Sequence, residues 1–103
     1  MDVRELIRGV IKEEFAKGGL TVEEIILFGS RARGDFNEDS DWDILVVVSE
    51  DIDRETYREL WYRVYRRLNV PIDLIIVPKG KLEELKDSPG FIYYYALREG
   101  VRI

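Results

Sequence analysis

Three aspartates in two apolar segments are the residues of this chain best suited to chemistry. Asp41 and Asp43 stand two apart at the start of an apolar run that ends at Val48. Because side chains alternate along a strand, residues 41 and 43 would point to the same face, with Cβ atoms about 7 Å apart. No Lys or Arg occurs in residues 39–45, so the two carboxylates would repel each other unless water or a cation lay between them. A hard divalent cation, held by one or two carboxylates plus phosphate oxygens, fits that arrangement.

Asp73 is the third candidate for the same site. It lies in residues 70–77, an otherwise apolar segment that we expect to form an internal strand. A carboxylate there is costly unless it lies at an accessible strand end or binds a metal ion. If this segment pairs with residues 41–48, Asp73 can join Asp41 and Asp43 in one acidic cluster. The alternatives are that Asp73 is a strand-end acid paired with an arginine, and that the other two are solvated loop acids.

A glycine, a serine and two arginines follow the apolar residues 24–28. Gly29 lets the backbone approach a ligand closely, and N–H groups at a helix start favour phosphate. The Ser30 hydroxyl adds a donor, and the guanidinium groups of Arg31 and Arg33 suit phosphate geometry. We therefore expect these four residues to bind nucleotide phosphates. For the two arginines, exposed positions on a helix are the alternative.

Composition narrows the chemistry further. The 103 residues include neither histidine nor cysteine, which excludes histidine triads, zinc sites and disulfides. Any metal must be held by oxygen ligands, which indicates magnesium, manganese or calcium. Residues 35–46 begin like an EF-hand calcium loop, but Ser40 occupies the glycine position and Val46 the final glutamate position, so we reject that interpretation.

Charge and hydropathy indicate a cytoplasmic protein. The net charge is −5 and the pI about 4.8, which argues against a general nucleic-acid-binding surface. The longest apolar runs, residues 44–48 and 74–77, are far shorter than a membrane span. The N-terminus is charged from its second residue and carries no signal-peptide pattern.

Apolar periodicity predicts the elements that position the three aspartates. Two segments carry apolar residues at helical spacing on one face, and several short runs between turn residues favour strands. In chain order we expect helix 3–15, strand 24–28, a short helix 30–34, strand 41–48, helix 57–68, strand 72–77, helices 79–86 and 91–98, and an edge strand 101–103. This order predicts a single domain, residues 1–103, of the α/β (α+β) class with a small mixed β-sheet flanked by helices.

Two further groups of side chains have more than one interpretation. The first group is aromatic and could stack on a nucleobase, but we expect it to pack in the core or at a partner interface. It consists of Tyr93, Tyr94, Tyr95, Trp61 and Tyr65. Arg63, Arg66 and Arg67 lie on one predicted helix and could form a solvated face or an acceptor-docking patch. The sequence leaves that choice open.

Two segments resemble the DNA polymerase β-like nucleotidyltransferases. They are residues 29–34, Gly-Ser-Arg-Ala-Arg-Gly, and residues 40–46, Ser-Asp-Trp-Asp-Ile-Leu-Val. The resemblance is greatest to their minimal nucleotidyltransferase (MNT) branch. Its signature is Gly-Ser, a gap of ten residues and Asp-x-Asp, and residues 31–40 fill that gap here. The third carboxylate of the family sits on a following strand, as Asp73 does. By element order the resemblance covers residues 5–77.

The resemblance implies the polymerase β-like fold and a metal-dependent transfer of a nucleotide. Asp41 and Asp43 would hold two Mg²⁺ ions, with Mn²⁺ as the alternative, and Gly29 and Ser30 would hold the triphosphate of ATP. Asp73 would help to hold the acceptor-side ion and could take the proton of the acceptor.

The resemblance also implies a partner. Similar proteins pair, as antitoxins, with a small helical HEPN-domain toxin, and some transfer AMP from ATP to a tyrosine of that toxin. The chain leaves no room for the extra domain of larger relatives, so we expect a homo- or hetero-oligomer to complete the acceptor site. The alternative is a non-catalytic antitoxin that neutralises its partner by occlusion, although retention of all three acids favours catalysis. An RNA nucleotidyltransferase is a weaker alternative because of the acidic pI.

Overall fold

The computed structural model describes residues 2–103, which form one four-stranded mixed sheet and the helices that pack on it. The elements in chain order are α1 (Val3–Lys17), β1 (Val22–Phe28), α2 (Ser30–Arg33), β2 (Trp42–Val48), α3 (Arg54–Arg67), β3 (Ile72–Pro78), α4 (Lys79–Leu85), α5 (Ile92–Glu99) and β4 (Val101–Arg102). The strand order is β3-β2-β1-β4, in which β2 and β3 run parallel and the other two pairs antiparallel. The predicted fold class and the predicted element order are confirmed.

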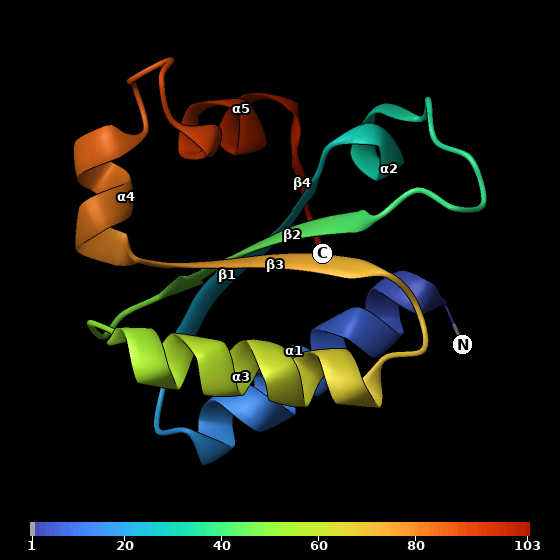
Figure 1. Ribbon diagram of the computed structural model, residues 1–103. Helices are drawn as coiled ribbons and strands as arrows, with labels where there is room; N and C mark the ends of the chain where they lie inside the picture. The colour runs from blue at the N-terminus through green and yellow to red at the C-terminus, as the bar shows by residue number, and fades with distance from the viewer. Residues whose placement is uncertain (1) are drawn as a thin grey trace.

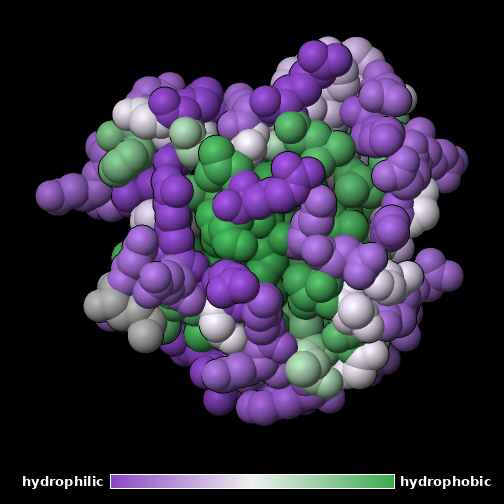
Figure 2. All heavy atoms as spheres, turned by 180° about the vertical axis from the view of Figure 1, so that it is seen from behind, coloured by the Kyte–Doolittle hydropathy of each residue, from purple (hydrophilic) through white to green (hydrophobic). Residues whose placement is uncertain are grey.

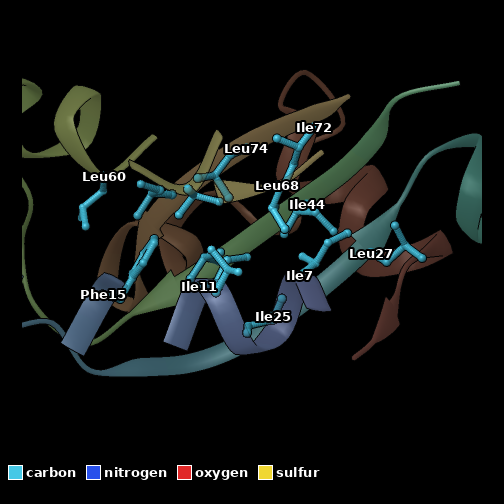
Figure 3. Packing of buried hydrophobic residues seen from close by; sticks show 14 of the residues in the cluster. Ile7, Ile11, Phe15, Ile25, Leu27, Ile44, Leu60, Leu68, Ile72 and Leu74 are labelled. Atoms are coloured by element: carbon cyan, nitrogen blue, oxygen red, sulfur yellow. The ribbon is translucent and has the colours of Figure 1, made fainter. Parts of the chain in front are cut away.

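Helices α1 and α3 lie side by side against one face of the sheet (Figure 1). Each begins at an aspartate cap: the Asp2 carboxylate accepts the N–H of Arg4 at 2.9 Å, and the Asp53 carboxylate accepts that of Thr56 at 2.7 Å. Their apolar stripes meet the strands in the larger core cluster. Figure 3 shows the side chains of Ile7, Ile11, Phe15, Leu60, Leu68, Ile72 and Leu74 in this cluster.

The opposite face of the sheet carries a smaller core beneath α4 and α5. Along β2, the residues Ile44, Val46 and Val48 belong to the larger cluster, whereas Leu45 and Val47 belong to the smaller one. This alternation assigns odd-numbered β2 positions to the α4 and α5 face. Position 43 therefore belongs to that face too, near the end of the sheet where β1 leads into α2 (Figure 1).

Strand β3 is an edge strand, and the expectation that residues 70–77 form an internal strand was wrong. Its free edge is partly covered by Tyr57 of α3, whose hydroxyl accepts the N–H of Ile76 at 3.1 Å and donates to the carbonyl of Leu74 at 3.3 Å. Asp73 is exposed at the start of this edge strand. Its carboxylate thus remains hydrated, which removes the cost of burying a charge.

The surface carries some apolar side chains among many charged ones. Figure 2 shows the side of the molecule turned away in Figure 1, where hydrophobic spheres gather near the centre of the face and hydrophilic ones surround them. Leu6 and Val101 are among the exposed large apolar residues. None of the helices between residues 2 and 103 is long and apolar enough to cross a membrane.

Candidate active site

The backbone of Gly29 lies directly against the carboxylate of Asp43. Gly29 connects β1 to α2 with φ 71° and ψ −158°, a conformation that side-chain-bearing residues avoid. A Cβ atom added to Gly29 would collide with the Asp43 carboxylate oxygen Oδ2. The neighbouring Phe28 is also the register partner of Asp43 across the β1–β2 pair. The predicted Gly-Ser segment and the predicted aspartate pair are thus in contact.

Asp43 and Asp73 are register partners on the parallel strands β2 and β3. Parallel partners point their side chains to the same face of a sheet, here the face of α4 and α5. Asp41 lies one residue before the first residue of β2 and is exposed, while Asp43 is half-buried. The register therefore places two of the three predicted acids beside each other, with the third two residues away along the chain.

The carboxyl group of Asp43 is influenced by both of the other acids. Burial raises the pKa of Asp43 above its usual range, and the negative charges of Asp73 and then Asp41 raise it further. Arg33 acts in the opposite direction, and Glu99 adds a weaker repulsion. The cluster thus carries excess negative charge at its centre, which a bound cation would relieve.

The donor set suits a hard cation, although the carboxylates do not form a closed cage. Across residues 2–103 the structure contains no group of three or more acidic side chains arranged to hold an ion by themselves. Mg²⁺ is commonly held through one or two carboxylates, with substrate phosphates and water completing its six ligands. Asp43 with Asp41 or Asp73 meets that requirement, and Asp41 and Asp73 are exposed and so have room to reorient.

Arg33 connects the short helix α2 to the C-terminal helix α5. Its guanidinium lies 3.1 Å from a carboxylate oxygen of Glu99 and 3.4 Å from one of Asp35. It also lies close enough to Asp43 to lower the pKa of that carboxyl. Arg33 is therefore close to the acid cluster. Its contact with a nucleotide stays a prediction.

Arg31 is engaged within the loop that separates the two motifs. Its guanidinium donates to the carbonyl of Ser40 at 3.0 and 3.2 Å and to that of Glu38 at 3.2 Å. It also lies over the rings of Phe36 and Trp42, 4.6 and 4.5 Å from their centres. The predicted contact of Arg31 with phosphate stays a prediction, and it would require the guanidinium to leave these partners.

Sequence reasoning missed Glu99 at this site. Glu99 is separated from Arg33 by 66 positions, and no spacing pattern relates the two residues. The close fit of Gly100 brings it there: a Cβ atom on Gly100 would collide with the Ala96 carbonyl oxygen, and it would lie 2.5 Å from Ile26 Cγ2. The end of α5 is thus packed tightly on β1.

The aromatic residues lie mainly outside this site. Trp61 stacks on Tyr65 at 5.1 Å between ring centres and packs against the larger core, and Tyr93 packs against the smaller one. Trp61 also lines a hollow of about 430 Å³ on α3, together with Ile52 and Tyr57, that includes none of the predicted site residues. Trp61 and Tyr93 are partly buried against the core, as expected, whereas Tyr65 and Tyr95 are exposed and the expected core packing was wrong for them.

The sequence pattern of the family "Polymerase beta, Nucleotidyltransferase" matches residues 10–103, which include the Gly-Ser segment and all three aspartates. The chain belongs to this nucleotidyltransferase family. It is also 32% identical over 93 residues to a Methanocaldococcus jannaschii protein with the name "Putative protein adenylyltransferase", a match that covers 85% of this chain and 88% of the relative. The chain is therefore a nucleotidyltransferase.

Solved structures share the fold. One is described as a "putative minimal nucleotidyltransferase" and is similar with a TM-score of 0.64 and 28% identity, over 100% of this chain and 97% of that one. Another is a toxin–antitoxin crystallised with AMP-PNP, with a TM-score of 0.65 and 21% identity, over 91% of this chain and 69% of that one. The resemblance to the MNT branch is thus confirmed at the level of fold and family.

Proposed function

We propose that this nucleotidyltransferase transfers AMP from ATP to a tyrosine hydroxyl of a cognate HEPN-type toxin and thereby acts as its antitoxin. The observation that carries the proposal is the contact of the Gly29 backbone with Asp43, in register with Asp73. In this arrangement, a turn that would bind phosphate lies against a carboxylate pair that would bind a cation. The adenylyltransferase name of the M. jannaschii relative and the toxin–antitoxin relative with AMP-PNP support this choice of reaction and partner.

The triphosphate would bind at the β1–α2 junction. Helix α2 begins at Ser30. The N–H groups of Ala32 and Arg33 already donate to the Gly29 carbonyl, which leaves those of Ser30 and Arg31 at the start of the helix. Together with the Ser30 hydroxyl, these groups are donors for phosphate oxygens. Because Gly29 has no side chain, the phosphates can approach the backbone beside Asp43. Arg33 supplies a positive charge at the same end of the sheet.

Asp41, Asp43 and Asp73 would hold divalent cations, Mg²⁺ in the cell, in one or two positions. A bound divalent cation supplies charge neutralisation at the phosphates and lowers the pKa of the attacking hydroxyl. The acceptor oxygen forms a bond to the α-phosphorus, the bond from that phosphorus to the β-phosphate oxygen breaks, and pyrophosphate leaves with the electron pair. The proton of the hydroxyl passes to the carboxylate of Asp73, which is exposed and so accessible to an acceptor.

Label transfer tests the reaction directly. The chain is incubated with its HEPN-domain partner, Mg²⁺ and ATP labelled either at the α-phosphate or at the γ-phosphate. We expect label from α-labelled ATP on the partner and none from γ-labelled ATP. The absence of α-label on a folded partner, with wild-type protein and Mg²⁺ present, would refute the proposal.

Neutralisation by occlusion is the second candidate function. The observation in its favour is that the described carboxylates do not form a ready cage for an ion. A double variant, Asp41→Asn and Asp43→Asn, separates the candidates because it keeps the side-chain shapes and removes both charges. If the double variant neutralises the toxin as well as wild type does, occlusion is sufficient; if it fails while still binding the toxin, the transfer is required.

A further inference from the structure

Arg31 of helix α2 contacts the loop that leads from this helix to β2. Its guanidinium bonds two backbone carbonyls, those of Glu38 and Ser40, and lies over the rings of Phe36 and Trp42. We refer to this group of contacts as the Arg31 clamp. Near its start, the loop is also joined to α2 by the Arg33–Asp35 pair at 3.4 Å. Further along, its other bonds are local ones around Asn37, including those between Asn37 and Ser40. The clamp is therefore the contact that joins the later part of this loop, next to Asp41, to α2.

Trp42 connects the Arg31 clamp to the carboxylates, because its ring lies under the Arg31 guanidinium and its backbone joins Asp41 to Asp43. Its side chain packs against the larger core cluster. Its backbone N–H donates to the Pro71 carbonyl at 2.9 Å. Ser40, whose carbonyl accepts twice from Arg31, immediately precedes Asp41. Both chain neighbours of Asp41 are thus held by one guanidinium, although Asp41 itself is exposed.

We propose that Arg31 is a positioning residue for cation binding: the clamp fixes the backbone on both sides of Asp41 and so holds Asp41 and Asp43 ready for the ion. This inference rests on the proposed function of the acids as cation ligands. It differs from the phosphate contact predicted from sequence, because in this role the guanidinium remains on Ser40, Phe36 and Trp42 while the ion is bound. A guanidinium is required, since an ammonium group cannot donate in a planar fork while stacking on two rings.

Variants at Arg31 test the clamp in a Trp61→Phe background, which leaves Trp42 as the only tryptophan. Arg31→Ala removes the clamp, and Arg31→Lys keeps the charge without the fork. Arg98→Ala is the matched control, because Arg98 lies over the ring of Tyr94 at 4.3 Å on α5 and contributes a cation–π contact outside the site. The readouts are the melting temperature, acrylamide quenching of Trp42, and the affinity for Mn²⁺ alone, measured from the free-ion electron paramagnetic resonance signal.

We expect Arg31→Ala to increase the quenching of Trp42 and to weaken Mn²⁺ binding about tenfold, since it removes charge-assisted hydrogen bonds and two ring contacts. In both Trp42 quenching and Mn²⁺ affinity, Arg31→Lys should be closer to Arg31→Ala than to the parent. Arg98→Ala should match the parent in Mn²⁺ affinity. Unchanged Mn²⁺ affinity in Arg31→Ala would overturn the proposal. So would an equal loss in Arg98→Ala, or a parent protein that binds no Mn²⁺.

The same variants separate the clamp from direct phosphate binding. If Arg31→Ala loses ATP affinity while its Mn²⁺ affinity and Trp42 quenching match the parent, Arg31 is a phosphate ligand and the positioning role is wrong. Mn²⁺ alone is the probe, so the result does not depend on AMP transfer. If the parent protein binds Mn²⁺, Arg31→Ala binds it more weakly and neither labels a partner, the proposed function is refuted and the clamp is supported.

Discussion

Replacing Gly29 with alanine is expected to disable the site through one added methyl group. Gly29 has φ 71° and ψ −158°, a region used almost only by glycine that costs other residues about 1–3 kcal/mol. For a domain of this size, that strain alone lowers the melting temperature by roughly 4–24 °C. The new Cβ atom would also collide with the Asp43 carboxylate, so Asp43 must move. A displacement of about 1 Å at a reacting centre is worth about a hundredfold in rate.

Gly19→Ala is the matched control for Gly29→Ala. Gly19 also has a positive φ, 77°, but a Cβ atom there meets nothing within 4 Å. Both variants should melt at lower temperature than wild type, whereas only Gly29→Ala should lose Mn²⁺ binding and AMP transfer when measured well below its melting temperature. Equal Mn²⁺ affinity and equal transfer rates in the two variants would show that the contact between Gly29 and Asp43 does not matter, and would refute the reasoning.

Three further predictions concern stability and its pH dependence. The pKa of Asp43 is raised in the folded state, so ionisation of this carboxyl destabilises the fold, and Asp43→Asn should raise the melting temperature at pH 7. The gain in melting temperature should vanish as the pH falls below 3.8, the ordinary pKa of an aspartate. A gain that does not change with pH would contradict this prediction. Tyr57→Phe leaves the N–H of Ile76 without its acceptor and should lower the free energy of unfolding by about 1 kcal/mol in urea titrations; no measurable loss would show that water replaces the hydroxyl. Hydrogen bonding to Arg67 holds the pKa of the buried Glu14 below its usual range. Arg67→Ala should therefore lower the melting temperature above pH 4.5, the ordinary pKa of a glutamate, and the difference from wild type should shrink as the pH falls. An equally large difference at pH 3 would contradict this.

The predictions from sequence that succeeded depend on local patterns. The apolar stripe of α1 and the burial of β2 on both of its faces follow from which residues must leave water, and both elements formed as expected. The register of Asp43 with Asp73 was expected only on the condition that the two strands pair, and they do. The short distance along the chain and the limited number of strands left few other pairings.

The predictions that failed or were missing depend on strand order and long-range packing. Strand β3 is as apolar as an internal strand, but it lies at the edge of the sheet. The Tyr57 hydroxyl of α3 bonds backbone groups of β3 that a further strand would otherwise pair with. Glu99 reaches the site through the packing of Gly100 on β1, which no local pattern encodes. The Arg31 clamp depends on the path of a polar loop, and turn residues alone do not determine that path.

In the proposed function, the acids beside Gly29 catalyse the transfer of AMP to a protein partner. The intact mass of the HEPN-domain partner, measured after co-expression with this chain, tests it most directly. We predict a mass increase of about 329 Da per added AMP with wild-type protein, located on a tyrosine, and no increase with the Asp41→Asn, Asp43→Asn double variant. A partner of unchanged mass, bound and neutralised by the wild-type chain, would contradict the claim.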